Sequence, residues 1–255
     1  MNKLAKRLTG LLDYIHRRGY ATIDELVAHF AVTPQTIRRD INTLAAQKKV
    51  QRFHGGVGLP PSTKNILYEQ RRDMFRQAKK DIAALVATHI PDSSSVCINI
   101  GTTTEEVAAA LLHHKNLRVL TNNLHVATIC TANPSFEILI TSGTVRHHDH
   151  GVTGSSAERF ISEFRVDYGV IGISGIDEEG NLLDFDYGEV SVARTIIASS
   201  RRVFLVTDNS KFGGPALARV GRLSDVTALF SNAPLEERWK KLVLDAGVKL
   251  YLAGE

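Results

Sequence analysis

The second part of this sequence alternates between short apolar runs and stretches with helical periodicity. The runs are short enough to be buried strands and too short to be buried helices. Strands that alternate with helices form a largely parallel sheet with helices on its faces, an α/β fold of the Rossmann-like type. The strands are expected at 96–100, 117–120, 136–140, 168–173, 203–206, 228–230 and 248–251, with helices around 155–164, 187–199 and 235–246 among those between them.

The N-terminal part begins with two helices. An apolar stripe from Leu8 to Ile15 has helical spacing, and Gly19 marks the end of that helix. Thr22 and Glu25 have the spacing of a capping box, in which each side chain pairs with a backbone N–H at the start of a helix. A second helix is therefore expected directly after Thr22.

A third helix begins at Thr33 and Pro34. Thr is favoured at the N-cap, and Pro is favoured at the first helical position. Ile37, Ile41 and Leu44 form its apolar stripe. The glycine-containing stretch 48–57 predicts a short hairpin after this helix. Together these elements are typical of a winged helix-turn-helix. The second helix of that motif, which is the third helix of this chain, enters the major groove of DNA.

The third helix leaves polar side chains outside its apolar stripe. Gln35 can pair with adenine or a phosphate, and Arg38 or Arg39 with guanine or a phosphate. Asp40 is expected to pair with a nearby arginine. The alternative is a three-helix bundle with a solvated basic face, but the combination of motifs favours DNA binding. The candidate DNA-contacting residues are Thr33, Gln35, Thr36, Arg38, Arg39, Arg52 and His54.

Charge is distributed unevenly along the chain. Residues 1–60 contain ten Lys and Arg against four Asp and Glu, whereas the remainder contains twenty-one against twenty-three. A basic N-terminal segment followed by a slightly acidic remainder is typical of a nucleic-acid-binding domain joined to a separate domain. Because short windows fluctuate by several charges, this observation supports the motif and does not replace it.

Several classes of protein are not indicated. No apolar run is long enough for a membrane span, and the N-terminus lacks the apolar region of a secretory signal. Cys97 and Cys130 have no metal-ligand spacing and are expected to be reduced thiols, so a cytoplasmic protein without metal or cofactor is expected. The histidine-rich run 147–150 has no matching ligand set elsewhere and is interpreted as a solvated loop.

Domain boundaries follow from the composition. A polar stretch with two prolines at 60–65 is typical of a linker. We therefore expect a winged helix-turn-helix domain at 1–58, a linker at 59–75 and an α/β effector-binding domain at 76–255.

Small polar residues follow the predicted strands, where ligands bind in open parallel sheets. Gly101 and the threonines after it open a helix, whose free N–H groups favour an anion. One such turn is weak support, since Thr is a common N-cap, but three polar strand ends in succession favour a binding site. The candidate effector-binding residues are Asn99, Gly101, Thr102, Thr103, Thr121, Asn122, Asn123, Ser142, Gly143, Asp177, Glu189 and Lys211.

Two of these residues allow more than one interpretation. Lys211 can pair with a ligand phosphate or with Asp208, and although a lone lysine is usually exposed to solvent, its position after a strand favours the site. Glu189 lies near a helix start, where a carboxylate stabilises the helix dipole without any ligand.

The chain resembles the deoxyribose-operon repressor (DeoR) family along nearly its whole length. The blocks that carry the resemblance are Asp24–Val27, Val32–Ile41 with Leu44, Arg52–Gly56, Gly101–Thr103, Thr121–Asn123, Gly169–Asp177, Asp184–Tyr187 with Glu189–Val190, and Ser210–Phe212. Asn99 departs from the pattern, which usually has Asp there. The family comprises bacterial regulators of sugar and polyol catabolism, whose sensor domain is similar in fold to sugar-phosphate isomerases such as ribose-5-phosphate isomerase.

The resemblance implies a repressor that is not an enzyme, whose affinity for operator DNA falls when a phosphorylated polyol or sugar such as glycerol 3-phosphate binds. It also implies a homodimer or homotetramer, which suits a palindromic operator. The competing class is an active sugar-phosphate isomerase with an appended DNA module, for which Asp177, Glu189 and Lys211 are of suitable types. A milder alternative is an activator of the same architecture, or a sensor of another sugar phosphate.

Overall fold

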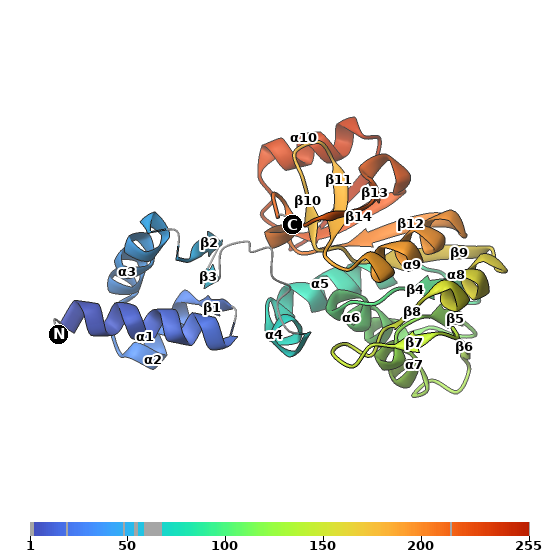
Figure 1. Cartoon of the computed structure of the whole chain (residues 1–255), viewed down its shortest axis with the longest axis horizontal. Coiled ribbons are helices and arrows are strands. Elements are labelled where there is room, and N and C mark those ends of the chain that lie inside the picture. Colours follow the sequence, from blue (N-terminus) through green and yellow to red (C-terminus); the bar gives the residue numbers. More distant parts are fainter. Residues whose placement is uncertain are drawn as a thin grey trace. The chain divides into compact units, whose positions relative to one another are not determined.

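The computed structural model describes residues 3–18, 20–47, 49–53, 56–58, 68–214 and 216–254 (Figure 1). The chain divides into two compact units, Met1–Arg76 and Gln77–Glu255. The division falls close to the predicted end of the linker, although a short helix, α4 (Tyr68–Asp73), lies within the predicted linker range.

The first unit contains the three predicted helices, α1 (Lys3–Arg18), α2 (Ile23–Phe30) and α3 (Pro34–Ala46). Both halves of the capping box of Thr22 and Glu25 are formed at the start of α2. Thr33 is the N-cap of α3, and its side chain accepts a hydrogen bond from the backbone N–H of Thr36. The local signals for both helix starts are therefore confirmed.

The wing of this unit is part of a three-stranded antiparallel sheet. Its strands are β1 (Tyr20–Thr22), β2 (Gln51–Phe53) and β3 (Gly56–Gly58), in the order β1-β3-β2. The core between the helices and this sheet is formed by Leu11, Ile15, Ala21, Leu26, Ile37, Ile41, Leu44, Val50 and Val57. The predicted stripe of α3 thus faces inward, which leaves the opposite face of the helix for a partner.

The second unit is built on a parallel sheet of seven strands, one for each strand predicted from the sequence. The observed strands start or end a few residues from the predicted positions. They are β4 (Ser95–Ile98), β5 (Arg118–Thr121), β6 (Glu137–Ile140), β9 (Val166–Ile171), β12 (Ser200–Val206), β14 (Ala228–Asn232) and β15 (Lys249–Ala253).

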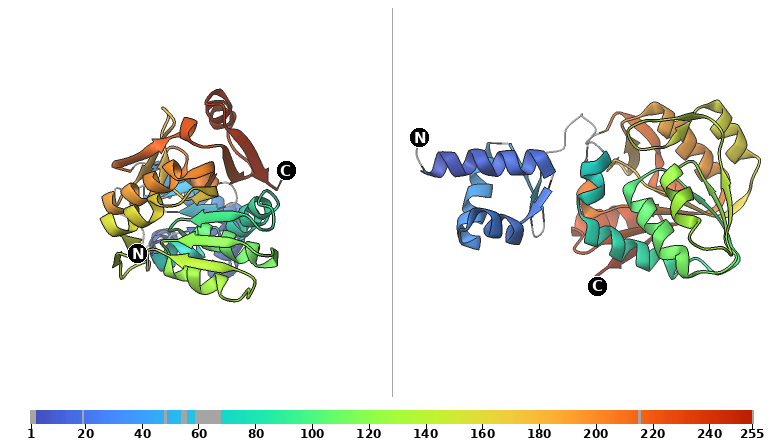
Figure 2. Two further views of the ribbon diagram at one scale, coloured as in Figure 1. Left: turned by 90° about the vertical axis from the view of Figure 1, so that its right-hand side faces the viewer. Right: turned by 90° about the horizontal axis from the view of Figure 1, so that it is seen from below.

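Helices cover both faces of this sheet, as Figures 1 and 2 show. One apolar core lies between the sheet and α5 (Arg76–Ala87), α6 (Thr102–Ala110) and α7 (Leu124–Cys130). The other lies between the sheet and α8 (Ser155–Ser162), α9 (Tyr187–Ala198) and α10 (Glu237–Asp245). This three-layer arrangement confirms the predicted Rossmann-like α/β fold.

Strand order locates the expected binding edge of the sheet. The order is β15-β14-β12-β9-β4-β5-β6, so the chain builds outward from β4 in one direction and then returns to build outward from β9 in the other. Ligands of open parallel sheets bind beyond the carboxyl ends of the strands at such a reversal. The residues that follow β4 and β9 are therefore the first candidates.

Short antiparallel elements that the sequence did not predict lie outside this sheet. A hairpin joins β7 (Thr144–Val145) and β8 (Val152–Thr153). A second small sheet contains β10 (Gly175–Ile176), β11 (Asn181–Asp184) and β13 (Ala218–Arg222). Single turns of 3₁₀-helix occur at Leu111–His113, Asn209–Lys211 and Leu223–Asp225.

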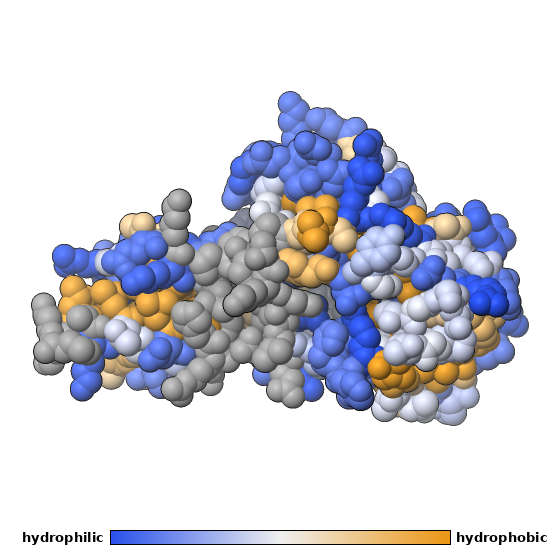
Figure 3. Space-filling view, viewed as in Figure 1, coloured by the Kyte–Doolittle hydropathy of each residue, from blue (hydrophilic) through white to orange (hydrophobic). Residues whose placement is uncertain are grey.

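Much of the face drawn in Figure 3 is hydrophilic, with hydrophobic surface gathered in a few areas. The large apolar side chains that are exposed are Leu4, Ile140, Val145, Tyr187, Leu217 and Leu244. In the described part of the chain, no helix has the length and apolarity needed to cross a membrane.

Candidate functional site

The outer face of α3 carries the predicted DNA-contacting side chains. Gln35, Arg38 and Arg39 are exposed, whereas Ile37 and Ile41 between them are buried. Thr36 is only half-exposed, and its hydroxyl lies 2.9 Å from that of Thr33. The two threonines therefore hold the start of the helix, and the free donors of this face belong to Gln35 and the two arginines.

Asp40 is held inside the first unit by Arg7 of α1. Two guanidinium nitrogens of Arg7 donate to the Asp40 carboxylate, one of them over 3.1 Å. The carboxylate is buried, so this ion pair fixes α3 against α1. The predicted arginine partner of Asp40 is thus confirmed. On the wing, Arg52 is exposed, while His54 lies outside the described residues.

The turn between β4 and α6 begins a helix that has no side-chain cap. Gly101 is the N-cap of α6 at φ +148°, a conformation that favours glycine, and it supplies no side-chain cap. The first N–H groups of a helix have no partner within the helix. Thr102 is buried and Thr103 half-buried at these positions. The Thr104 hydroxyl donates to the carbonyl oxygens of Asn99 and Gly101, which holds the turn in place.

Polar side chains at the ends of β4 and β5 are buried together. Thr121 donates through its hydroxyl to the carbonyl oxygen of Ile98, and Asn123 caps α7 and donates to Glu105 over 3.0 Å. Asn122 donates to the carbonyl oxygen of Val152 in β8. The structure thus brings the polar ends of these two strands together, and whether they bind an effector stays a proposal.

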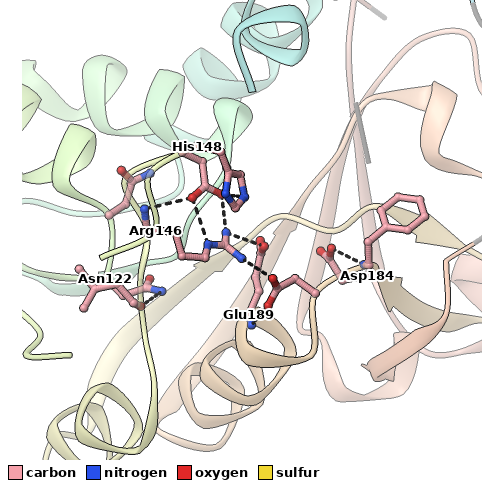
Figure 4. A network of polar contacts seen from close by, with 12 residues as sticks. Asn122, Arg146, His148, Asp184 and Glu189 are labelled. Atoms are coloured by element: carbon pink, nitrogen blue, oxygen red, sulfur yellow. Dashed lines mark hydrogen bonds and ion pairs between the residues drawn. The ribbon is translucent and has the colours of Figure 1, made fainter. Parts of the chain in front are cut away.

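Arg146 is the centre of a charged network that sequence reasoning missed (Figure 4). Its guanidinium pairs with Asp149 in the same loop, with Glu189 over 2.9 Å and with Asp186 over 3.3 Å, and the last two open α9. Burial by itself lowers the pKa of the guanidinium, but the carboxylates of Glu189 and Asp149 outweigh it and raise the pKa of Arg146. Arg146 is therefore a permanent cation.

This network corrects one interpretation of the sequence. The histidines at 147, 148 and 150 are exposed, as expected of a solvated loop, but Asp149 is buried on Arg146. No sequence signal marked the whole network, because Asp186 and Glu189 lie about forty residues further along the chain than Arg146. Across the described residues, no cluster of three or more His, Cys, Asp or Glu side chains is placed to hold a metal ion.

The remaining candidates are spread more widely. Ser142 and Gly143 are exposed after β6, and an added Cβ on Gly143 would lie only 2.6 Å from the carbonyl oxygen of Thr153. Asp177 lies in the turn between β10 and β11, where its carboxylate accepts from the N–H groups of Glu179 and Asn181. Gly143 and Asp177 thus have structural roles that need no ligand.

Lys211 is half-buried in the 3₁₀ turn after β12. Asp208, its predicted alternative partner, instead accepts hydrogen bonds from Ser210 through both the backbone N–H and the hydroxyl. The described residues show no ion pair between Lys211 and Asp208.

Comparison with known families gives a match for each unit. The DeoR-like helix-turn-helix domain matches residues 7–63, and the DeoR C-terminal sensor domain matches residues 74–233.

Individual proteins match over almost their full length. The chain is 44% identical to the glycerol-3-phosphate regulon repressor of Escherichia coli over 98% of this chain and 99% of that protein. It is 46% identical to the repressor of the same name from Haemophilus influenzae, over 96% and 98%. It is 42% identical to the HTH-type transcriptional repressor CsqR of Escherichia coli, over 96% and 94%. Among solved structures, ribose 5-phosphate isomerase of Methanocaldococcus jannaschii gives a TM-score of 0.40 at 11% identity over 54% of each chain.

Proposed function

Because the chain belongs to the DeoR family of transcriptional regulators, we propose that it is a repressor controlled by a phosphorylated polyol or sugar. In this proposal residues 1–58 bind operator DNA, residues 76–255 bind the effector and residues 59–75 link them. Effector binding releases the operator, which requires that the effector bind one arrangement of the protein more tightly than the other. Glycerol 3-phosphate is a first candidate, since two relatives carry its name.

The observation that carries this proposal is the division of α3 into two faces. Ile37, Ile41 and Leu44 anchor one face in the core, and Gln35, Arg38 and Arg39 leave donors and acceptors on the other. A recognition helix in the major groove needs such a face, because base edges are distinguished by hydrogen bonds.

The DNA-binding part is tested by Arg38→Ala, with Lys241→Ala on the exposed side of α10 as the matched control. If Arg38 contacts a base, operator affinity falls by about 1–3 kcal/mol while binding to random duplex DNA is retained. Titration of both DNAs by fluorescence anisotropy at one salt concentration measures this. An equal loss on both DNAs assigns Arg38 to a phosphate contact, and no loss on either removes Arg38 from the DNA interface.

The sensing part is tested on the operator complex. Thr102→Ala and Lys211→Ala are expected to bind the operator normally and to be released less well by the effector. A thermal-shift screen of phosphorylated polyols and sugars, with inorganic phosphate alongside, identifies the ligand, because a compound that binds only the folded state raises the melting temperature.

We further propose that the effector is bound without turnover, although Asp177, Glu189 and Lys211 are types that isomerisation chemistry uses. Glu189 is engaged by Arg146, and Asp177 by a turn. Steady conversion of a sugar phosphate by the purified protein contradicts this point. A symmetric homodimer or homotetramer is proposed, because the two half-sites of a palindromic operator need two DNA-binding domains related by symmetry.

A further inference from the structure

Three polar residues occupy equivalent positions at the ends of neighbouring strands. Ile98, Thr121 and Ile140 are register partners at the ends of β4, β5 and β6. The next residues are Asn99, Asn122 and Thr141, which we call the polar row. Because adjacent strands lie about 4.8 Å apart, the row spans about 10 Å.

All three side chains of the row lie on one face of the sheet. Cys97, Leu120 and Leu139, two residues earlier in each strand, pack in or against the core under α8 and α9. Side chains two residues apart in a strand point to the same face. The hydrogen bond from Asn122 to Val152 agrees with this direction, because β8 lies on the same face next to α8 and α9.

The polar row is buried yet incompletely hydrogen-bonded. Asn99, Asn122 and Thr141 are only 1%, 0% and 5% exposed. Both polar atoms of the Asn99 amide, the Asn122 Oδ1 and the Thr141 hydroxyl have no hydrogen-bond partner among the described residues. Thr121 and Asn123, directly beside the row, are fully engaged in the structure. Buried polar groups are nearly always paired in folded proteins, so a cluster of exceptions indicates a missing partner.

The charges around the row indicate the chemistry of that partner. Arg146 is surrounded by the carboxylates of Asp149, Asp186 and Glu189, so its charge is already compensated within the protein. An anion therefore gains little from Arg146, whereas the start of α6 offers backbone N–H groups, with the buried carboxylate of Glu105 in the same turn held by Asn123. The row itself is neutral and offers both donors and acceptors, which suits hydroxyl groups.

We propose that the polar row binds the hydroxyl-bearing carbon chain of the effector, with the phosphate at the start of α6. The proposal rests on the proposed function and narrows it to a phosphorylated sugar or polyol with at least one hydroxyl for each row residue. Glycerol 3-phosphate offers fewer hydroxyls than the row has residues, so it binds more weakly than a pentose or hexose phosphate. In this proposal Thr141 is a residue that determines which phosphorylated compound binds.

The test uses Thr141→Val in the full-length protein, a substitution that keeps the shape of the side chain and removes its hydroxyl. Thr195→Val on α9 is the matched control, because its hydroxyl already donates to the carbonyl oxygen of Ser191. Calorimetric titration compares inorganic phosphate, glycerol 3-phosphate, ribitol 5-phosphate and fructose 6-phosphate. The wild type is expected to bind one of the longer compounds most tightly.

Thr141→Val is expected to lower the affinity for the longer compound about threefold to tenfold and to leave the affinity for inorganic phosphate unchanged. The melting temperature of the ligand-free Thr141→Val variant is expected to equal or exceed that of the wild type, because the Thr141 hydroxyl has no hydrogen-bond partner among the described residues. Asn99→Leu is a second variant with the same expected pattern, and Thr195→Val is expected to bind every compound like the wild type.

Two results overturn the proposal. If glycerol 3-phosphate binds as tightly as the longer compounds and Thr141→Val leaves all affinities unchanged, the row does not read hydroxyls. If Thr141→Val lowers the melting temperature of the ligand-free protein without affecting affinity, buried water is the partner of the row. A protein that binds no phosphorylated compound at all contradicts the proposed function itself, which is a different result from either.

Discussion

Arg146 joins two segments that are distant in the sequence. Its guanidinium is only 10% exposed and pairs with Asp149 on one side and with Glu189 at the start of α9 on the other. Removing one partner of a buried ion pair is costly, because the buried carboxylates that remain lose the cation they face. The network therefore fixes the loop after β7 against α9.

Arg146→Met is accordingly expected to destabilise the second unit by about 3–5 kcal/mol. Urea denaturation monitored by circular dichroism measures the loss, and Arg159→Met on the exposed side of α8 is the control. Unchanged stability in Arg146→Met is the contrary result, and it would mean that the carboxylates find other partners.

The two cysteines are buried thiols with suppressed reactivity. Burial raises the pKa of Cys97 to about 12 and that of Cys130 to about 11. Since the thiolate is the reactive form, alkylation by iodoacetamide is expected to stay slow in the folded protein between pH 7 and 9, and to become fast in urea. Mass spectrometry of the labelled protein reads this directly. In the unfolded chain the cysteine thiols ionise at lower pH than in the folded protein. A pH above 9.0 therefore favours the unfolded state, and both cysteines lower the stability of the folded protein there.

Among the secondary-structure elements, the seven strands of the parallel sheet were predictable from the sequence and the short antiparallel strands were not. The central strands are compact apolar runs because they are buried on both faces, and the edge strands β6 and β15 are also apolar although they are only partly buried. In contrast, β7, β8 and β10 have two residues each, too few to show any alternation. Their pairing depends on packing against the large sheet, which no local pattern records.

The candidate site divides in the same way. Gly101, Thr121 and Asn123 were found because strand ends and helix caps have local signatures. Thr141 directly follows β6, so the rule that selects polar residues after a strand applies to it as well as to Ser142 and Gly143. Arg146 could not be found from the sequence, because an ion pair with a residue of another segment leaves no spacing to detect.

Gly143 offers a test of the β7–β8 hairpin. Its φ of +143° and the nearby carbonyl oxygen of Thr153 leave no room for a Cβ. Gly143→Ala is expected to loosen the hairpin and to speed amide hydrogen exchange at Val152, whose N–H donates to Asn122. Gly172→Ala is the control, since an added Cβ there meets nothing closer than 3.8 Å. Equal exchange rates in both variants would show that the hairpin tolerates the strain.

The whole molecule contains separate cores. Leu11 to Val57 supply the core of the first unit, and the two cores of the second unit use only residues from 82 onward. Units that share no core are expected to unfold in separate transitions.

Ile41→Ala is expected to cost the first unit about 2–5 kcal/mol and to leave the second transition unmoved in differential scanning calorimetry. Val107→Ala is the reciprocal variant, which lowers only the transition of the second unit. A single transition that shifts as a whole in both variants would mean that the units unfold cooperatively.

The position of β8 beside Asn122 has a consequence for timing. Val152 is bonded to Asn122 through both its N–H and its carbonyl oxygen, and Gly151 abuts Ile100. If the polar row binds a metabolite as proposed, that molecule must pass these contacts, so their opening sets the rate at which it enters and leaves. Slow opening of this segment would therefore lengthen the time for which a bound molecule stays in place without changing which molecule is preferred.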